Sequence, residues 1–254
     1  MIHCFWENFP GGARIPICAC PVEDPGGEAA EVLLFPAGGY DLEGSVSLPD
    51  PAAGNAVALS EPCPVSRLFP AVVLAQADAI IKALELSPRV LLFAEGLVGE
   101  AIRAALAGAP EVETVVARIP LEGRSPEAGV GELDPCDPGF TDSLKAMTGG
   151  EGFTQVILAS SRPEMVRRAL GSAAVLGRVY FLLPAGGRAS VDLTATVNFK
   201  SLILRGWNFF SGLEKLTASE VEEAMESAGS LSPVPESGAG GIGFAVVDNP
   251  GGWS

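Results

Sequence analysis

Short apolar runs alternate with helical patterns between residues 71 and 206, and this alternation limits the folds that the chain can adopt. Residues 71–86 hold neither glycine nor proline and keep apolar side chains near one face, which predicts a helix ended by Ser87 and Pro88. The run RVLLFA at 89–94 is typical of a strand covered on both faces. Strands alternating with helices at this spacing predict βαβ units in a mostly parallel α/β sheet. Further elements are expected as helices at 97–110, 140–150 and 163–177 and strands at 112–118, 154–160, 178–184 and 201–206.

Changes in composition and hydrophobic pattern divide the chain into three regions. Residues 1–70 are rich in proline and glycine and hold short extended runs, so they predict β structure with tight turns. Residues 71–210 carry the alternating pattern. Residues 211–254 hold an acidic helix at 217–229 and, after a Gly/Ser/Pro linker, a last short strand at 243–247. We therefore expect domains at 1–70 and 71–210 and a C-terminal piece at 211–254.

Composition excludes two classes of partner. The chain has 254 residues, of which 48% are hydrophobic, enough for a sizeable core. Its formal net charge of −15 would repel a nucleic-acid backbone or an anionic membrane, so neither is expected to bind. No stretch approaches the roughly 18 apolar residues of a membrane span. The start MIHCFWENFPGG lacks the basic segment of a signal peptide, which makes the cytoplasm the expected compartment.

The five cysteines do not predict a disulfide framework, because they are odd in number and scattered along the chain. Cys18 and Cys20 are separated by one residue, a poor spacing for a zinc knuckle. His3 and Cys4 are the other soft ligands nearby. Two interpretations of this segment stay open: a metal site, or free thiols in a partly buried segment, where cysteine is usually found.

The stretch LLFAEGLVGE at 91–100 joins a predicted strand to a predicted helix, where dinucleotide-binding proteins place the pattern G-x-G-x-x-G. The three glycine positions fall on Ala94, Gly96 and Gly99. Alanine is tolerable at the first position if its φ stays negative, at some cost in the geometry of the bend. The carboxylate of Glu95 would repel a diphosphate unless it points outward. The stretch is either a phosphate-binding turn with a changed first glycine or a strand that simply meets a helix.

The end of the second predicted strand bears on the choice of cofactor. An Asp or Glu there would accept hydrogen bonds from the adenosine ribose and favour NAD. The residues present are Ala117 and Arg118, and an arginine fits a 2′-phosphate instead. This favours NADP over NAD. The alternative is that Arg118 is a solvated charge at a strand end.

Several segments together resemble the cofactor domain of the medium-chain dehydrogenases and reductases, the zinc-type alcohol dehydrogenase superfamily. They are ALELSPRVLLFAEGLVGEAIRAAL, VETVVAR, LKAMTGGEGFTQVILASSRPEMVRRALGSAAVLGRVYFLLPAGG and VNFKSLILRGWNFF. Upstream, GSVSLPDPAAGNAVALSEPCPV resembles the tail of the family's catalytic domain. The resemblance covers residues 44–210.

This resemblance implies a Rossmann-like, doubly wound parallel sheet preceded by a reduced, mostly β region that is a remnant of a GroES-like catalytic domain. Residues 211–254 would return to that N-terminal region. It also implies a homodimer through the sheet edge between Ser201 and Gly206. The cofactor contacts it implies are Ala94, Gly96, Leu97, Val98 and Gly99 at the pyrophosphate, Arg118 at the 2′-phosphate, and Leu183 and Pro184 beside the nicotinamide.

The sequence departs from the family where zinc and proton transfer are concerned. The region before the cofactor domain is far shorter than the family's catalytic domain, and the single histidine, His3, leaves the zinc-binding motifs without a place. The expectation is no zinc, as in zinc-free members of the family that act on a carbonyl or enone. Candidates for proton transfer are Tyr40, Ser45, Cys63 and Lys200, and their spacing selects none of them.

Three functions stay open on this basis. The first is a zinc-independent, NAD(P)-dependent oxidoreductase that acts on a small carbonyl, alcohol or enone. The second is a catalytically silent relative, a dimeric interaction or assembly subunit that has lost the cofactor. The third is a nucleotide-binding sensor whose dimer contacts respond to the cofactor. We expect an enzyme, with the substrate and the catalytic residues undecided.

Overall fold

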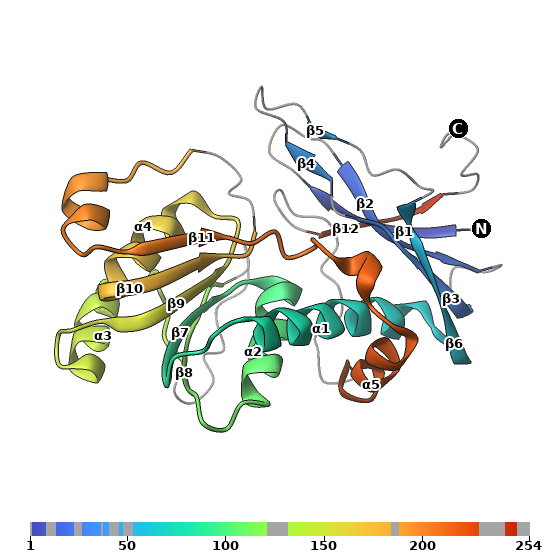
Figure 1. The fold of residues 1–254 in the computed structure, drawn as a ribbon, viewed down its shortest axis with the longest axis horizontal. Coiled ribbons are helices and arrows are strands. Elements are labelled where there is room, and N and C mark those ends of the chain that lie inside the picture. Colours follow the sequence, from blue (N-terminus) through green and yellow to red (C-terminus); the bar gives the residue numbers. More distant parts are fainter. Residues whose placement is uncertain are drawn as a thin grey trace. The chain divides into compact units, whose positions relative to one another are not determined.

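The computed structural model describes residues 2–8, 14–22, 27–36, 38–40, 46–47, 53–120, 132–183, 188–228 and 242–247. The chain forms two compact units (Figure 1). Unit 1 comprises Met1–Gln76 and Phe210–Ser254, and unit 2 comprises Ala77–Phe209. Within the described ranges, no helix has the length and apolar character needed to cross a membrane.

Unit 1 is built on a five-stranded antiparallel sheet with the order β12-β1-β2-β3-β6. The C-terminal strand β12 pairs with β1 at one edge, in register from Ile2 opposite Val247 to Glu7 opposite Ile242. A separate two-stranded ribbon pairs β4 with β5. The strands are β1 (Ile2–Asn8), β2 (Arg14–Pro21), β3 (Glu28–Leu34), β4 (Gly39–Tyr40), β5 (Val46–Ser47), β6 (Asn55–Pro64) and β12 (Ile242–Val247). The helices are α5 (Ala218–Ala228), a 3₁₀ turn at Leu213–Lys215 and the start of α1 (Val65–Ala83).

Helix α1 begins at Val65, earlier than the predicted start at residue 71, and therefore contains Pro70. Proline removes a backbone donor and would ordinarily end or kink a helix. Here the burial of neighbouring side chains offsets that cost: Leu68 and Phe69 are buried, and the Phe69 ring stacks on Phe5 of β1 with ring centroids 3.9 Å apart. Burial of two large apolar side chains stabilises the added turns by about 3 kcal/mol or more, comparable with the proline penalty.

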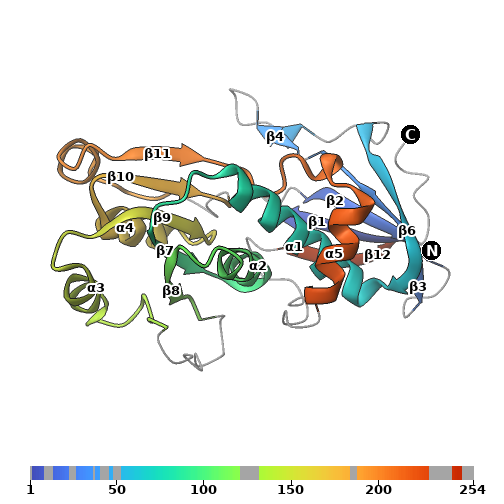
Figure 2. The ribbon, with the colours of Figure 1, turned by 60° about the horizontal axis from the view of Figure 1, so that its bottom comes forward.

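Unit 2 is a five-stranded parallel sheet with the order β11-β10-β9-β7-β8, which confirms the predicted doubly wound α/β fold (Figure 2). The first strand along the chain, β7, lies between β8 and β9, so the strand order reverses there. Such a switch point is where open α/β sheets bind ligands, at the carboxyl ends of the strands. The strands are β7 (Arg89–Ala94), β8 (Glu113–Arg118), β9 (Phe153–Ala159), β10 (Ala173–Phe181) and β11 (Ile203–Gly206). The helices are α2 (Gly96–Ala107), α3 (Phe140–Thr148), α4 (Pro163–Ser172) and a π-helix at Leu193–Asn198.

The central strands are buried on both faces, as continuous apolar runs predict. Val90, Leu91, Leu92 and Phe93 of β7 are all fully buried. Leu91 and Phe93 belong to one apolar cluster with side chains of α3 and α4, which includes an edge-to-face contact between Phe93 and Phe140 at 5.8 Å. Their neighbours in sequence face the opposite side of the sheet, which is therefore also covered. This core fixes the ends of β7 and β9, where the candidate site lies.

The predicted helix at 163–177 is too long, because α4 ends at Ser172 and β10 begins at Ala173. The sequence ALGSAAVLG carries no strong stop signal, so the boundary is set by pairing with β9, where Ala173 lies opposite Phe153. The first part of β10 is irregular: Leu176 has a φ of 60°, and a register shift separates Ala173 from Arg178. Tertiary pairing thus overrides the helical pattern.

Candidate functional site at the end of the parallel strands

The turn between β7 and α2 uses its two glycines for different reasons. Gly96 has a φ of 59°, a left-handed conformation that side chains rarely adopt, and open space faces it. Gly99 has an ordinary φ, but a Cβ there would lie 2.8 Å from both the carbonyl carbon and the Cα of Ala94. Glycine at this position therefore lets α2 pack directly on the end of β7. Ala94 keeps a negative φ, the condition under which alanine suits the first position.

Glu95 is the N-cap residue of α2, and its carboxylate makes no hydrogen bond to the helix N-terminus. It accepts instead from Ser160 Oγ at 2.5 Å and forms an ion pair with Arg162 Nε at 2.6 Å. Arg162 also donates from Nη2 to the carbonyl oxygen of Pro120 at 2.7 Å. The negative charge that the sequence places in the turn is thus neutralised outside the helix terminus.

Within the described ranges, the first backbone N–H groups of α2 have no hydrogen-bond partner. Its first intrahelical bond runs from Gly99 N–H to the carbonyl oxygen of Glu95 at 3.1 Å. The N–H groups of Gly96, Leu97 and Val98 precede that bond and lie outside the helical ladder. Because the side chains of Leu97 and Val98 are buried, these residues offer backbone groups alone. Three N–H groups and the helix dipole together favour an anion such as a phosphate.

Ser160 and Arg162, which sequence analysis missed, join the ends of three neighbouring strands. Glu95 follows β7, Pro120 follows β8, and Ser160 and Arg162 follow β9. Ser160 Oγ also accepts from the backbone N–H of Arg162 at 3.1 Å, which fixes the turn into α4. The available signal was their position, since polar residues directly after a buried central strand lie at the carboxyl edge of the sheet.

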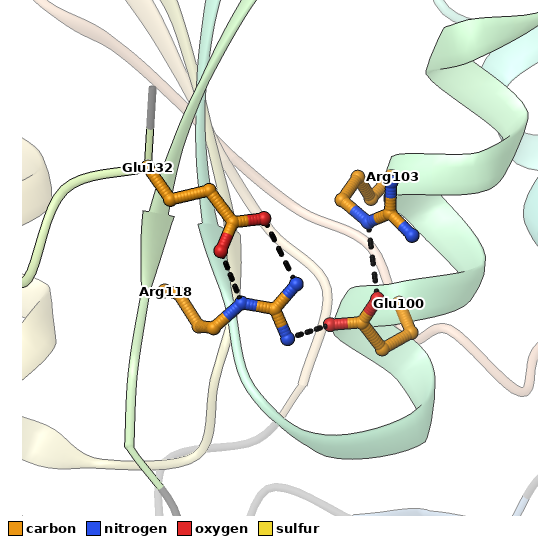
Figure 3. A network of polar contacts seen from close by, with 4 residues as sticks. All are labelled: Glu100, Arg103, Arg118 and Glu132. Atoms are coloured by element: carbon orange, nitrogen blue, oxygen red, sulfur yellow. Dashed lines mark hydrogen bonds and ion pairs between the residues drawn. The ribbon is translucent and has the colours of Figure 1, made fainter. Parts of the chain in front are cut away.

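Arg118 lies at the end of β8 in a network of charged side chains (Figure 3). Its Nε and Nη2 contact both carboxylate oxygens of Glu132 at 2.6 and 2.9 Å, and its Nη1 contacts Glu100 of α2 at 2.5 Å. Glu100 also pairs with Arg103 at 3.0 Å. The side chain of Arg118 is 31% exposed, and the hydrogen bonds that it donates to Glu132 raise its pKa above the ordinary value. Arg118 is therefore paired with two carboxylates, neither free nor simply solvated.

The segment that carries Glu132 is held along β8 by backbone hydrogen bonds. Arg118 N–H donates to the carbonyl oxygen of Leu133 at 2.8 Å, and Leu133 N–H donates to that of Val116 at 2.9 Å. This pairing sets the Glu132 carboxylate beside the guanidinium of Arg118. The bidentate geometry is the strong form of such a pair.

The two residues expected beside a nicotinamide lie just after β10. Leu183 is half-buried and follows Leu182, whose N–H donates to the carbonyl oxygen of Leu158 at 3.0 Å. Leu183 therefore lies at the carboxyl edge of the sheet, the edge to which Glu95 and Ser160 also belong. Pro184 lies outside the described residues.

The candidates for proton transfer that the structure describes lie on different elements. Lys200 Nζ donates to three carbonyl oxygens at the end of α4 and the start of β10, those of Leu170 at 3.4 Å, Gly171 at 2.8 Å and Ala173 at 2.7 Å. It thus satisfies a helix C-terminus, and burial lowers its pKa. Cys63 is buried in β6, Tyr40 belongs to β4, and Ser45 lies outside the described residues.

The cysteines of unit 1 are free thiols in the core. Cys4, Cys18, Cys20 and Cys63 are buried, and Cys136 of unit 2 is exposed. Burial is the main reason why the pKa of Cys20 rises to about 12, so its thiol stays protonated at neutral pH. Among the described residues, no group of three or more His, Cys, Asp or Glu side chains is arranged to hold a metal ion.

Comparison with solved structures identifies the class of fold. A benzyl alcohol dehydrogenase from Acinetobacter calcoaceticus is similar over 89% of this chain and 82% of its own, with a TM-score of 0.55 and 14% identity. A quinone oxidoreductase from Pseudomonas syringae pv. tomato DC3000 matches over 91% and 81%, with a TM-score of 0.56 and 15% identity. A D-arabinose dehydrogenase from Sulfolobus solfataricus matches over 90% and 87%, with a TM-score of 0.53 and 14% identity.

These matches cover about nine tenths of the chain and therefore include residues of both units. The chain has the fold of the medium-chain dehydrogenases and reductases, as the segments at 44–210 indicate. No family model and no curated protein matches the sequence. At these identities the likeness establishes the fold, and the function has to be argued from the site.

Proposed function

We propose that the protein is a zinc-independent, nicotinamide-dependent oxidoreductase that acts on a small carbonyl, alcohol or enone. The observation that carries this proposal is the turn at 94–99, where Gly96 and Gly99 take the required roles and Glu95 is paired outside the helix terminus. In it, the backbone N–H groups of Gly96, Leu97 and Val98 bind the pyrophosphate. A bound dinucleotide would supply the hydride, and Leu183 and Pro184 would flank its nicotinamide ring.

The proposal that zinc is not required rests on the chemistry of the donors. The described cysteines of unit 1 are buried, and burial raises the pKa of Cys4, Cys18, Cys20 and Cys63, which opposes the thiolate form that binds zinc. An odd set of unpaired cysteines also suits a reducing compartment, and on this ground we place the protein in the cytoplasm.

The choice between NADP and NAD depends on Arg118. The sequence favours NADP, yet a 2′-phosphate at Arg118 has to displace a carboxylate that already holds the guanidinium in two hydrogen bonds. We therefore propose NADP, or NAD, as the cofactor, with Glu132 limiting the affinity for NADP. A carboxylate beside a phosphate dianion adds repulsion, which the neutral amide of glutamine would not.

Replacing Glu132 with glutamine should increase the affinity for NADPH by about tenfold and change the affinity for NADH by less than about twofold. Fluorescence titration of the bound nicotinamide measures both constants. Glu113→Gln is the matched control, since Glu113 lies at the opposite end of β8 from Arg118 and also pairs with an arginine, Arg89. Equal changes for the two cofactors would show that Arg118 does not contact the 2′-phosphate.

A second candidate function is a catalytically silent, dimeric interaction or assembly subunit, or a nucleotide sensor built on the same dimer. Its supporting observation is that the charged groups of the site pair with one another, Glu95 with Arg162 and Arg118 with Glu100 and Glu132. Such pairs stabilise a site without a ligand. The proposed partner of either form is a second copy of the chain.

The edge strand β11 supports the proposed homodimer. It is the terminal strand of the parallel sheet, and Ile203 and Leu204 are 57% and 41% exposed. Phe199, which precedes β11, and Leu176, which lies in β10, are also exposed. An open strand edge with apolar side chains is a template for pairing with another chain.

Substitution of Leu204 by glutamate should convert the dimer into a monomer. Sedimentation equilibrium should give twice the chain mass of 26.1 kDa for the wild type and a single chain mass for the variant. The reason is that an unpaired carboxylate in the centre of a strand-to-strand interface costs several kcal/mol. Glu214→Gln in unit 1 serves as the control. A wild type that sediments as a monomer at all concentrations would refute the dimer.

A further inference from the structure

A cavity of about 550 Å³ lies in unit 2 between the start of α4 and residues 188–190, which follow β10. Three arginines line it, Arg167, Arg168 and Arg188, together with Glu164 and Ser190. Glu164, Arg167, Arg188 and Ser190 are exposed, so the cavity opens to solvent. None of its lining residues belongs to the turn at 94–99 or to the Arg118 network.

The charge of this cavity is opposite to that of the chain. Three arginines and one glutamate line it, in a protein with 31 acidic and 16 basic residues. Elsewhere in unit 2, Arg89, Arg103, Arg118, Arg162 and Arg178 each form an ion pair with a glutamate. Within the part of the chain that the structure describes, the cavity arginines have no carboxylate within 4.0 Å. Their mutual repulsion favours an anion in the cavity.

Two of the arginines, Arg167 and Arg168, are each held by a contact before any ligand arrives. Arg167 Nη2 donates to the carbonyl oxygen of Ser190 at 3.2 Å, which ties α4 to the segment that carries Arg188. The guanidinium carbon of Arg168 lies 6.0 Å from the ring centroid of Phe140, a cation–π contact with α3. Preorganised guanidinium groups lose less rotamer entropy on binding, which increases affinity.

We propose that this cavity binds the phosphate group of a small phosphate ester. Arginine presents a planar set of donors that matches phosphate oxygens. The three arginines and Glu164 together carry a net charge of +2, which balances a phosphate dianion. The volume exceeds that of phosphate alone and suits an organic part as well. This inference rests on the arginine cavity alone and holds whether or not the protein binds a dinucleotide.

Calorimetric titration of the full chain with glucose 6-phosphate, inorganic phosphate and malonate at constant ionic strength tests the proposal. The titrations are run with saturating NADPH as well as without it, so that phosphate binding at the N-terminus of α2 is separated from binding at the cavity. We expect the ester to bind at least as tightly as inorganic phosphate, and malonate to bind more weakly. Equal binding with and without NADPH is expected.

Variants of the lining residues assign the binding to the cavity. Arg167→Gln and Arg188→Gln should each raise the dissociation constant of the ester by about tenfold. Glu164→Gln should lower it by roughly threefold, because it removes the one repelling carboxylate, and a gain of affinity cannot result from unfolding. Arg178→Gln, which removes an arginine elsewhere in unit 2, should change it by less than about twofold.

Three results would overturn the proposal. One is the absence of saturable binding of either phosphate compound up to roughly 20 mM, a concentration above the dissociation constant expected of a specific site. Another is an equal loss of affinity in Arg178→Gln and in the two cavity variants. The third is tighter binding of malonate than of the ester, which would assign the cavity to dicarboxylates.

Discussion

Replacing Gly99 with alanine should weaken dinucleotide binding by at least about a hundredfold and lower the free energy of unfolding by about 1–3 kcal/mol. The added Cβ would lie 2.8 Å from two backbone atoms of Ala94. Backbone cannot rotate away as a side chain can, so the first turn of α2 has to move from the end of β7. The N–H groups of Gly96, Leu97 and Val98 then no longer converge on one phosphate.

Gly171→Ala is the matched control for this substitution. Gly171 is exposed in α4, and a Cβ there would meet no atom within 4 Å. Gly171 is the second-last residue of α4, and alanine has a higher helix propensity than glycine. The free energy of unfolding of this variant should therefore be unchanged or higher by up to about 1 kcal/mol. Nicotinamide fluorescence gives the affinities and urea unfolding gives the stabilities. Wild-type affinity in Gly99→Ala would refute the assigned role of the turn.

Glu7→Gln should stabilise the protein at alkaline pH. Glu7 lies in β1 opposite Ile15 and Ile242, is 4% exposed, and neither carboxylate oxygen has a hydrogen-bond partner among the described atoms. Burial raises its pKa from the ordinary value of 4.5 to about 8. The folded state thus keeps a proton that the unfolded state loses between these values, and stability falls as pH rises through this window. A shift of this size lowers the free energy of unfolding by at most roughly 5 kcal/mol above pH 8.

Urea unfolding from pH 5 to pH 9 measures this effect. The difference in free energy of unfolding between Glu7→Gln and the wild type should grow with pH and level off above about pH 8. Glu31→Gln, an exposed glutamate of the same sheet, should differ from the wild type by less than about 0.5 kcal/mol at every pH. Parallel pH profiles for Glu7→Gln and the wild type would mean that Glu7 is ionised in the folded protein.

The strands of unit 2 could be predicted because their signal is local. Each of β7, β8 and β9 is an apolar run bounded by turn residues, and their ends differ from the expected ones by a residue or so. The boundary between α4 and β10 could not be predicted, since the pairing of Ala173 with Phe153 decides it and no residue between 169 and 176 excludes a helix. The length of α1 depends in the same way on the contact between Phe69 and Phe5.

In the candidate site, too, the local features could be predicted from the sequence and the long-range contacts could not. The positions of Gly96 and Gly99 follow from spacing, because a turn from strand to helix imposes its geometry within six residues. The state of Glu95 and Arg118 does not follow, since their partners Ser160, Arg162 and Glu132 come from other segments of the chain. The sequence predicts that Glu95 repels a diphosphate unless it points outward and that Arg118 binds a 2′-phosphate or is solvated, whereas in the fold both residues form ion pairs.

Titration of the wild-type protein with NADPH and NADH, followed by nicotinamide fluorescence and checked by thermal shift, tests the proposed function most directly. We expect saturable binding of at least one of the two with a micromolar dissociation constant, and an increase in melting temperature that tracks the occupancy. The N-terminus of α2, with Glu95 held by Ser160 and Arg162, would account for that affinity. Absence of binding of either cofactor at millimolar concentration would contradict the account and favour the silent dimeric subunit.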